Sequence, residues 1–538
     1  MKYTNIILTV FAASTLWANA QTTQTQAQPT QSEVRTQPIE LPNVIIEGKE
    51  QINVQSGVKQ FPDRPTKLTA ADIDSINPPQ KLKALLLPTK TMPTELIDKT
   101  YKKGYLRADI GNYLTANVAA GYETSSREYS FLGKGWLNYS DGHVKDADYA
   151  GGGVDLKLLY IAPKKFWIFG GSKTTGNVAF GLNSYNMYGM DSVIARDAMT
   201  LNLSVKSEGE YSGYDFLTGA GFRAFGLDHG DKDGSDNKFN AFLKLKTLFD
   251  RVEVNALADI ELRGIGDNST NLFEIGAGAK FLLDEMTFDL NGVFQSVGST
   301  DDVQRANVKL DAGFDYRISP DFTAKVKLST GFDNQQLYEL WQYNRYMNNT
   351  PTIDFSYDKA ITAYLQYHPT QIIMASVGIK LSATDRFKYF VPDSLKIFDL
   401  KYSDADAMAI FAKASIDLTE IDMLYGEIQY ENRTLSDSND SKVPFIPAFR
   451  AEIAYDRKWT EKLGTHIEVE YAGKRYADVE NEIELDAFLN LNIGVDYELQ
   501  QNLKIFGRLE NLLNSEIYRW NNYKEREIYI SAGLLWQF

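Results

Sequence analysis

Polar and apolar residues alternate along most of the chain after Gly104, in segments of roughly 10 to 16 residues that are separated by turn residues. The clearest segment runs from Arg305 to Ile318. Its apolar face is formed by Ala306, Val308, Leu310, Ala312, Phe314, Tyr316 and Ile318, and its polar face by Arg305, Asn307, Lys309, Asp311, Gly313, Asp315 and Arg317. A second segment, from Leu485 to Leu499, alternates in the same way. This period of two predicts long β-strands with one apolar and one polar face.

The length of these segments indicates where the strands lie. Strands of soluble sandwiches average about 5–6 residues, whereas about 9–11 residues in a tilted strand cross a bilayer. A face that is apolar and a face that is charged suit lipid on the outside of a barrel and water on the inside. The pattern therefore predicts an all-β fold, a transmembrane antiparallel β-barrel that occupies residues 104–538.

Short turns and longer links alternate along this region, which is the pattern of bacterial outer-membrane barrels. Counting segments gives about 22 strands, an even number that places both ends on the periplasmic side. The short turns lie near residues 162–165, 249–251, 283–285, 319–321, 368–371, 419–421 and 499–501. The longer links lie near residues 181–197, 227–236, 264–270, 298–303, 333–357, 385–403, 435–446, 476–484 and 511–524.

Composition narrows the function classes. The chain has 538 residues, 56 Lys and Arg against 71 Asp and Glu, and a net charge of −15, which argues against a nucleic-acid partner. It has no cysteine and only 4 histidines, so disulfides and thiolate metal sites are excluded and no cofactor is expected. His466 should face the lumen beside Glu468, but no histidine has an evident nucleophile partner, so we do not expect an enzyme.

The N-terminus predicts export. Lys2 is followed by an apolar stretch over residues 6–17 and by Ala18-Asn19-Ala20, which together are typical of a secretory signal peptide cleaved after residue 20. A buried N-terminal helix is the alternative. Residues 21–39 are rich in Gln and Thr and have no apolar period, which predicts a disordered periplasmic tether.

The C-terminus ends in an aromatic residue on an alternating segment. Ile530, Leu534, Trp536 and Phe538 share the apolar face of residues 528–538. This arrangement resembles the C-terminal signal that the barrel-assembly machinery of the outer membrane reads. It predicts that machinery as a partner during biogenesis and outer-membrane lipid as the final surroundings.

Two further passages resemble TonB-dependent receptors. Residues 510–518, ENLLNSEIY, resemble the NLFNxxY element that closes the penultimate strand of those receptors before the last long loop. Residues 40–48, ELPNVIIEG, resemble the TonB box, in which Leu41, Pro42, Val44, Ile45 and Ile46 would add as a strand to the sheet edge of a TonB-type partner. A single buried strand is the alternative interpretation of this short motif.

The chain departs from the receptor pattern between box and barrel. A full receptor carries a plug of well over one hundred residues there, but this chain has only the segment 49–103. Residues 40–103 therefore resemble a TonB box followed by a vestigial plug, as in reduced receptor-like barrels of Bacteroidetes-type bacteria. This departure puts import by plug movement in doubt.

Two loops carry candidate binding residues. Asp231, Asp233 and Asp236 offer oxygen ligands for Ca²⁺, although the EF-hand spacing is absent and a solvated acidic loop is the favoured interpretation. In the loop 333–350, an outside ligand would contact Tyr338, Trp341, Tyr343, Arg345 and Tyr346. An interfacial aromatic girdle is the alternative. Further loop aromatics are Phe387, Tyr389, Phe390, Trp520 and Tyr523.

The sequence thus predicts a TonB-dependent-receptor-like transport protein of the outer membrane of a Gram-negative bacterium, working with a TonB-type partner. Two alternatives remain. One is a barrel that transports nothing and serves as a scaffold or subunit of a surface complex. The other is a passive porin.

Overall fold

The computed structural model describes residues 103–538, apart from 230–231, 267, 300–303, 334–335, 371, 420 and 437–440. The predicted signal peptide (residues 1–20), tether (21–39) and TonB box with vestigial plug (40–103) fall on residues 1–102, apart from Lys103. They lie outside the described residues, so these assignments stay predictions.

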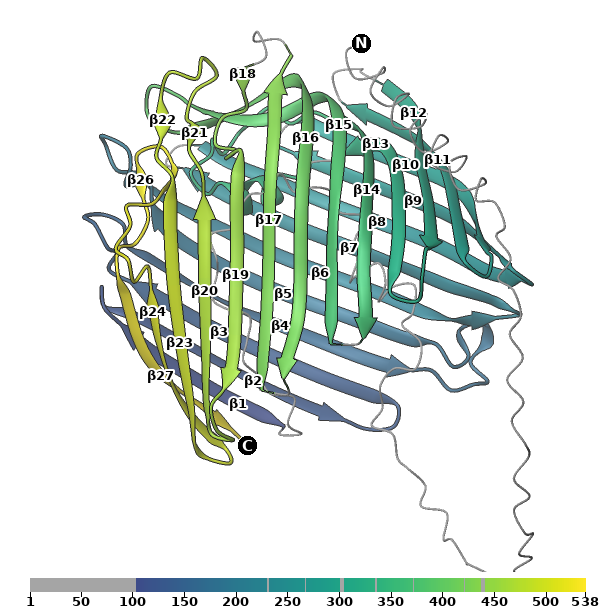
Figure 1. Ribbon diagram of the computed structural model, residues 1–538, viewed down its shortest axis with the longest axis horizontal. Coiled ribbons are helices and arrows are strands. Elements are labelled where there is room, and N and C mark those ends of the chain that lie inside the picture. Colours follow the sequence, from purple (N-terminus) through teal and green to yellow (C-terminus); the bar gives the residue numbers. More distant parts are fainter. Residues whose placement is uncertain are drawn as a thin grey trace, which may run out of the picture. The chain divides into compact units, whose positions relative to one another are not determined.

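A closed antiparallel β-barrel forms the described part of the chain (Figure 1). Its sheet has 23 strands, of which β18 is a two-residue addition to β17, so the wall has the predicted 22 strands. The strands are β1 (Gly104–Gly111), β2 (Thr115–Ser125), β3 (Tyr129–Ser140), β4 (Tyr149–Ile161), β5 (Lys173–Asn186), β6 (Ala195–Tyr211), β7 (Tyr214–His229), β8 (Lys232–Phe249), β9 (Val252–Ile265), β10 (Asn268–Leu282), β11 (Met286–Ser299), β12 (Gln304–Arg317), β13 (Phe322–Asp333), β14 (Ser356–Thr370), β15 (Ile373–Pro392), β16 (Phe398–Thr419), β17 (Asp422–Leu435), β19 (Phe449–Lys458), β20 (Leu463–Ala472), β23 (Phe488–Gln500), β24 (Leu503–Glu510) and β27 (Tyr529–Gln537).

The first and last strands close the barrel. β1 pairs with both β2 and β27, and the register places Ala108 opposite Leu534. At the closing corner, the backbone N–H of Gly104 donates to the carbonyl of Phe538 at 2.8 Å, and the N–H of Phe538 donates back at 2.9 Å. We call the end of the barrel where β1 begins and β27 finishes the turn end, and the opposite end the loop end.

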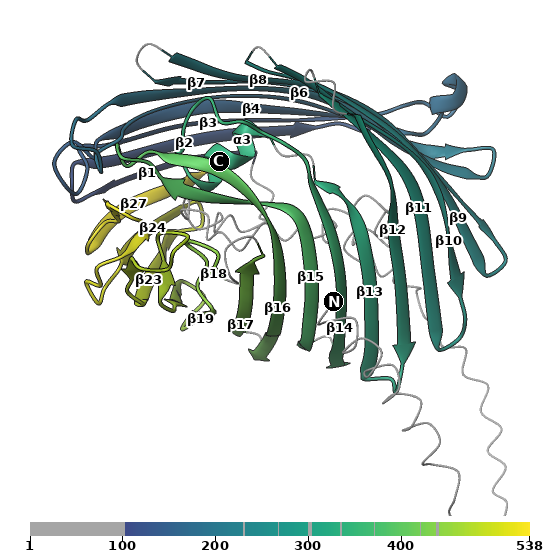
Figure 2. The same cartoon turned by 90° about the horizontal axis from the view of Figure 1, so that it is seen from above.

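Small elements decorate the links. A 3₁₀-helix, η1 (Trp167–Phe169), lies at the turn end. At the loop end the α-helix α3 (Leu337–Tyr343) lies inside the ring of strands, as the view from above shows (Figure 2). The short strands β18 (Ser441–Lys442), β21 (Arg475–Tyr476), β22 (Glu484–Leu485), β25 (Tyr518–Trp520) and β26 (Tyr523–Lys524) also belong to links at this end. No helix among the described residues is both long and apolar enough to cross a membrane.

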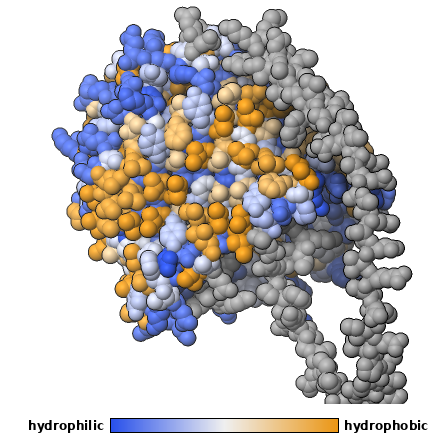
Figure 3. Space-filling model, viewed as in Figure 1, coloured by the Kyte–Doolittle hydropathy of each residue, from blue (hydrophilic) through white to orange (hydrophobic). Residues whose placement is uncertain are grey.

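The two faces of the strands differ as the alternation predicted. Apolar side chains such as Phe273, Ile275 and Leu290 are exposed on the outside, and Figure 3 shows hydrophobic residues across the middle of one face of the molecule with hydrophilic residues toward the loop end. In β12, Val308 is exposed outward, while Lys309 lies near Asp311 at 4.0 Å. Alternating strands therefore give an apolar outer surface and a charged lumen.

The second alternating segment begins later than predicted. The sequence pattern started a strand at Leu485, but β23 begins at Phe488. Leu485 belongs to the two-residue strand β22, pairs with Arg475 and is buried. The apolar alternation extends past the strand in the sequence, because a leucine buried in a link and a leucine facing outward from a strand are the same apolar residue to the pattern.

Several predicted long links are tight hairpins. The predicted link at 227–236 shrinks to residues 230–231, and the one at 264–270 shrinks to residues 266–267. The strands β7, β8 and β9 continue instead, with pairs such as Ser235 to Gly226 and Lys238 to Arg263. Strand pairing satisfies the backbone of these polar segments, so polar composition alone overestimated the loop length.

Candidate functional site: a chamber beneath an aromatic cluster

Aromatic side chains from distant links meet inside the loop end of the barrel. They come from β5 and the link after it, β7, α3 and the link after it, β15, β16 and the links 436–448 and 511–528. We call this group the aromatic cluster: Tyr185, Tyr188, Phe225, Tyr338, Trp341, Tyr343, Tyr346, Phe390, Phe398, Phe445, Trp520 and Tyr523. It is a hydrophobic core that the loops build together.

Ring contacts hold the cluster together. Tyr346 stacks on Tyr523 with ring centroids 3.6 Å apart. Trp520 makes edge contacts at 5.1 Å with both Tyr343 and Phe398 and lies 4.9 Å from Phe445. Such aromatic pairs contribute about 0.5–1.5 kcal/mol each beyond the area that they bury. Trp520 therefore joins the last long link to three other parts of the loop end.

A buried ion pair anchors α3 to the wall. The helix has no side-chain cap of its own. Instead, the Asp236 carboxylate accepts the N–H of Leu337 at 2.8 Å and two N–H groups of Arg263 at 2.8 and 3.0 Å. The Asp236 and Arg263 side chains are 2% and 1% exposed. A carboxylate at a helix N-terminus satisfies free N–H groups and favours the helix dipole.

The C-terminal part of α3 and the residues that follow it are held to β5 and β6. The Trp341 indole donates to the Tyr185 hydroxyl at 2.8 Å, and that hydroxyl donates to the carbonyl of Arg345 at 2.6 Å. Arg196 also donates to the carbonyls of Arg345 and Met347. The segment after α3 is thus held to the wall by buried hydrogen bonds.

The last long link, 511–528, has its own anchors. Arg519 binds both Glu470 oxygens, at 2.7 and 2.8 Å, and Glu525 at 2.7 Å. Burial opposes the charge of Arg519, but the Glu525 and Glu470 carboxylates raise its pKa above the usual value. Nearby, burial and then the charge of Arg519 lower the pKa of Arg475 to about 10. This charged network fixes the position of the link.

Below the aromatic cluster lies a chamber of about 2100 Å³. The rings of Tyr338, Trp341, Tyr346, Trp520 and Tyr523 line it together with polar residues of β1–β6, β19, β20, β23, β24 and β27. The chamber reaches the turn end, where Leu418 and Lys462 line it, and it is larger than the roughly 300–1,000 Å³ of most small-molecule sites. Its aromatic rings and converging polar groups are of the kind that line such sites.

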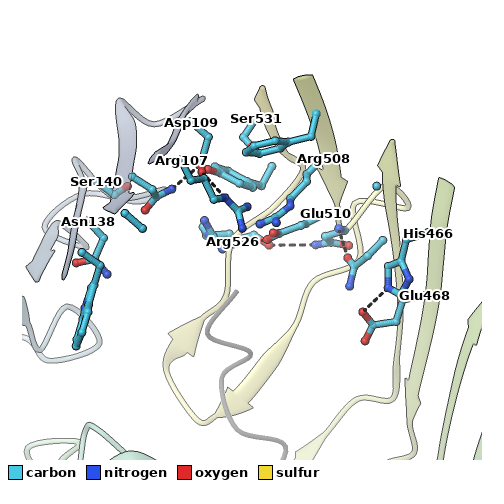
Figure 4. A pocket seen from close by; sticks show the side chains of 18 of the residues that line it. Arg107, Asp109, Asn138, Ser140, His466, Glu468, Arg508, Glu510, Arg526 and Ser531 are labelled. Carbon is cyan, nitrogen blue, oxygen red and sulfur yellow. Dashed lines mark hydrogen bonds and ion pairs between the residues drawn. The ribbon is translucent and has the colours of Figure 1, made fainter. Parts of the chain in front are cut away.

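Charged residues gather on the wall of the chamber near the seam, the place where β1 pairs with β27 and closes the barrel (Figure 4). Arg107 and Asp109 of β1 lie beside Arg508 of β24, and Arg526 donates to Glu510 at 3.0 Å. Farther along the wall, His466 lies 2.7 Å from Asp456 and 3.9 Å from Glu468. The lumenal position predicted for His466 beside Glu468 is confirmed.

The residues predicted as ligand contacts in the loop 333–350 line the chamber, and some of them also pack into the aromatic cluster. Tyr338, Trp341, Tyr343, Arg345 and Tyr346 all line the chamber. Trp341 is only 8% exposed because it packs into the aromatic cluster. The structure brings the five together, and their contact with a ligand stays a prediction. Phe387 and Tyr389 instead join a separate cluster with Leu435 and Val443.

The acidic set does not converge among the residues described. Asp236 is buried in its pair with Arg263, whereas Asp233 is exposed on the other side of β8, and Asp231 lies outside the described residues. Groups of three or more His, Asp or Glu residues that would hold a metal are absent from the described part of the chain. At the C-terminus, Ile530, Leu534, Trp536 and Phe538 share the exposed face, and their role in assembly stays a prediction.

Sequence reasoning missed the seam arginines, the Asp236–Arg263 pair and Tyr185. Arg107 and Arg508 each follow the strand alternation, as dozens of other lumenal residues do, so nothing local distinguishes them. Only the register of β1, β24 and β27 places them on one patch of wall.

The link 511–528 carries a pH-sensitive contact. His143 Nε2 donates to the carbonyl of Lys524 at 2.7 Å, and Tyr188 donates to the same oxygen at 2.8 Å. Burial lowers the pKa of His143 below 6.5, and the hydrogen bond to Lys524 only partly offsets this effect. When the link moves away from His143, the imidazole regains its ordinary pKa, so below pH 6.5 this opened state binds more protons than the observed state. The contact between His143 and the link therefore weakens as the pH falls through the lowered pKa. Above pH 6.5 the full contribution of neutral His143 is present.

We therefore expect amide exchange in residues 511–528 to accelerate between pH 7.5 and pH 5, after correction for intrinsic exchange. His143→Asn keeps an N–H donor but does not titrate, so its corrected exchange should stay level over the same range. An equally steep rise in His143→Asn would contradict the assignment.

Comparison with known proteins supports the fold but gives no family by sequence. No family model and no curated protein matches the chain. Among solved structures, the chain is similar to the ferric-catecholate import receptor Fiu from E. coli K12, with a TM-score of 0.65 and 8% identity over 81% of this chain and 82% of that one. The siderophore receptor PiuA from Acinetobacter baumannii gives a TM-score of 0.66 and 8% identity, covering 82% of both chains. The pyoverdine receptor FpvA from Pseudomonas aeruginosa PAO1 gives 0.66 and 10%, covering 83% of this chain and 79% of that one.

Proposed function

We propose that this protein is an outer-membrane transport protein of a Gram-negative bacterium that moves a small solute through its lumen with the help of a TonB-type partner. The observation that carries the proposal is the combination of a closed 22-strand barrel, an apolar outer face and a chamber with the aromatic cluster at its loop end. Solved proteins of similar fold include import and siderophore receptors, an iron transporter and a copper transporter.

The proposal includes the parts of the chain that precede the barrel. Residues 1–20 act as a signal peptide, residues 21–39 as a periplasmic tether, and residues 40–103 as a TonB box with a reduced plug of Bacteroidetes type. The turn end of the barrel then faces the periplasm, since β1 begins there. The aromatic cluster at the loop end favours gated passage over a passive porin, because a porin needs a water-filled opening.

Membrane placement predicts the cost of a charge on the outer face. Ile275 lies in the middle of β10, is 52% exposed and pairs with Phe294 and Ala258. Ile275→Arg should destabilise the folded barrel by about 2–4 kcal/mol, because an arginine at the bilayer midplane is poorly solvated. Urea unfolding of the protein in lipid vesicles measures this difference.

The control is Leu395→Arg. Leu395 is 58% exposed but lies in a link at the loop end, outside the strands. We expect a change within about 0.5 kcal/mol, as at most surface positions. Equal effects of the two substitutions would argue that the outer face of β10 meets water.

The box residues provide the test of energised transport. An added strand must donate backbone hydrogen bonds to its partner, and proline has no N–H to donate. Ile45→Pro should therefore reduce site-specific crosslinking between the box and the TonB-type protein of the host at least tenfold. Gln24→Pro, in the predicted tether, is the matched control and should crosslink as wild type does.

Unchanged crosslinking of Ile45→Pro would reject the box. If, in addition, a stoichiometric partner co-purified with both variants, the chain would act as a scaffold or subunit of a surface complex. If no partner co-purified and the folded protein conducted ions freely, it would be a porin.

A further inference from the structure

The wall where the first and last strands meet carries an unusual group of arginines. Arg107 comes from β1, Arg508 from β24 and Arg526 from the link that precedes β27. All three line the chamber (Figure 4). They lie in a chain whose net charge is −15, and the carboxylates of Asp109 and Glu510 lie beside them, so the question is which of the arginines these carboxylates bind.

A single phenylalanine organises two of these arginines. The guanidinium of Arg107 lies 4.6 Å from the centre of the Phe506 ring, and that of Arg508 lies 5.4 Å from it. The ring crosses β27 at Gly533, where an added Cβ would lie 2.5 Å from the ring tip and 2.5 Å from the Cβ of Asp109. Glycine at this position therefore lets one ring reach both arginines.

Among the described residues, the carboxylates in the group form no hydrogen bond with these two arginines. Glu510 is bound by Arg526 at 3.0 Å. Asp109 accepts a hydrogen bond from Asn117 at 2.7 Å and forms an ion pair with Arg107 whose nitrogen–oxygen distance, 3.6 Å, exceeds that of a hydrogen bond. The Nε and Nη2 atoms of Arg107 are buried without a hydrogen-bond acceptor. Among the described residues, no carboxylate pairs with Arg508.

Arginines elsewhere in the same lumen show what a structural role looks like. Arg263 contacts Asp236 at 2.8 Å, Arg433 contacts Glu431 at 2.7 Å, and Arg519 contacts Glu470 at 2.7 Å. Each of these cations has a carboxylate at hydrogen-bonding distance. Arg107 and Arg508 lack one, and their like charges repel each other beside a shared ring.

We propose that Arg107 and Arg508 form a binding site for the anionic group, a carboxylate or a phosphate, of the solute that occupies the chamber. A guanidinium that stacks on a ring keeps its N–H edge free. That edge presents parallel donors that match two oxygens of a carboxylate or phosphate. The bound anion lies against the parts of the two guanidinium groups that line the chamber and removes the repulsion between the two cations.

This site deepens the proposed function, since it gives the transported solute a negative charge. Its test is nevertheless independent of transport, because binding to the isolated protein needs no TonB-type partner. Loss of energised uptake with intact anion binding would reject the transport proposal alone. Failure of the wild-type protein to bind either anion, with intact crosslinking at the box, would reject the arginine site alone.

The experiment is calorimetric titration of the full-length protein, folded in detergent, with citrate and separately with inorganic phosphate. We expect at least one of the two anions to bind to the wild-type protein. Arg107→Gln/Arg508→Gln should weaken that binding at least tenfold. Arg107→Lys/Arg508→Lys keeps both charges but loses the paired donors, and it should bind between the wild type and the glutamine variant.

A matched control removes the same amount of charge outside the chamber. Arg251 pairs with Asp284 in a turn, and Lys413 pairs with Glu427 on another part of the wall. Arg251→Gln/Lys413→Gln should bind as the wild type does. The inference is overturned if neither anion binds to the wild type, or if the glutamine variant at Arg107 and Arg508 binds as tightly. The lysine variant keeps the test valid if the glutamine variant does not fold.

Discussion

Asp236→Asn should release helix α3 from the barrel wall. The substitution leaves the Arg263 guanidinium buried without its carboxylate and weakens the acceptor of the Leu337 N–H. Breaking one side of a buried ion pair typically costs about 3–5 kcal/mol. We expect this cost to appear as faster amide exchange in residues 337–349, by a factor of at least one hundred at equal pH.

The barrel itself should survive this change, because its strand pairs do not depend on α3. Circular dichroism in the far ultraviolet should therefore match the wild type. The control is Asp284→Asn, which breaks the exposed pair with Arg251 at 3.4 Å and should alter exchange little, as surface pairs contribute about 0–1 kcal/mol. Wild-type exchange around α3 in Asp236→Asn would show that the aromatic cluster alone holds the helix.

Trp520→Ala should loosen the aromatic cluster at the loop end of the chamber. The indole contacts Tyr343, Phe390, Phe398 and Phe445, so its loss separates the last long link from α3 and from the strands β15 and β16. Trp520 is partly buried, so its removal should cost less than the about 3–5 kcal/mol typical of a fully buried aromatic side chain. We expect more frequent or larger ion-conducting openings in planar bilayers than the wild-type protein shows.

Trp459→Ala is the matched control for this experiment. Trp459 is exposed in the turn after β19, where Arg457 stacks on it and Thr465 accepts its N–H. Its loss removes an indole of the same size without touching the aromatic cluster. If both variants conduct alike, Trp520 does not control access to the chamber.

Strand number and facing were accessible from the sequence because they rest on a local rule. In β12, side chains from Arg305 to Arg317 alternate between the outer face and the lumen, and the composition of each face distinguishes the two. Link lengths were less accessible. The polar residues of the 227–236 segment resemble a loop, but strand pairing with β7 and β9 gives their backbone the same hydrogen bonds that water would give.

The site depended on contacts between residues far apart in the chain. Tyr338 to Tyr346 could be chosen from the sequence because five aromatic and charged residues stand close together in one link. Tyr185 and Arg345 meet across 160 positions, and Arg223 and Gln336 across 113. Neither pair leaves a local signal, so these hydrogen bonds at the loop end of the chamber are visible only in three dimensions.

The seam between Gly104 and Phe538 also constrains how the chain reaches its folded state. Its two backbone hydrogen bonds join the ends of a loop that includes the whole barrel, and the entropy cost of closing a loop rises with its length. Contacts of such long range make folding slow. Until the seam forms, β1 and β27 each expose an unpaired strand edge to other chains. A tag or truncation at the C-terminus would therefore act on the step that protects the molecule from aggregation, whereas an insertion in a link at the loop end would spare it.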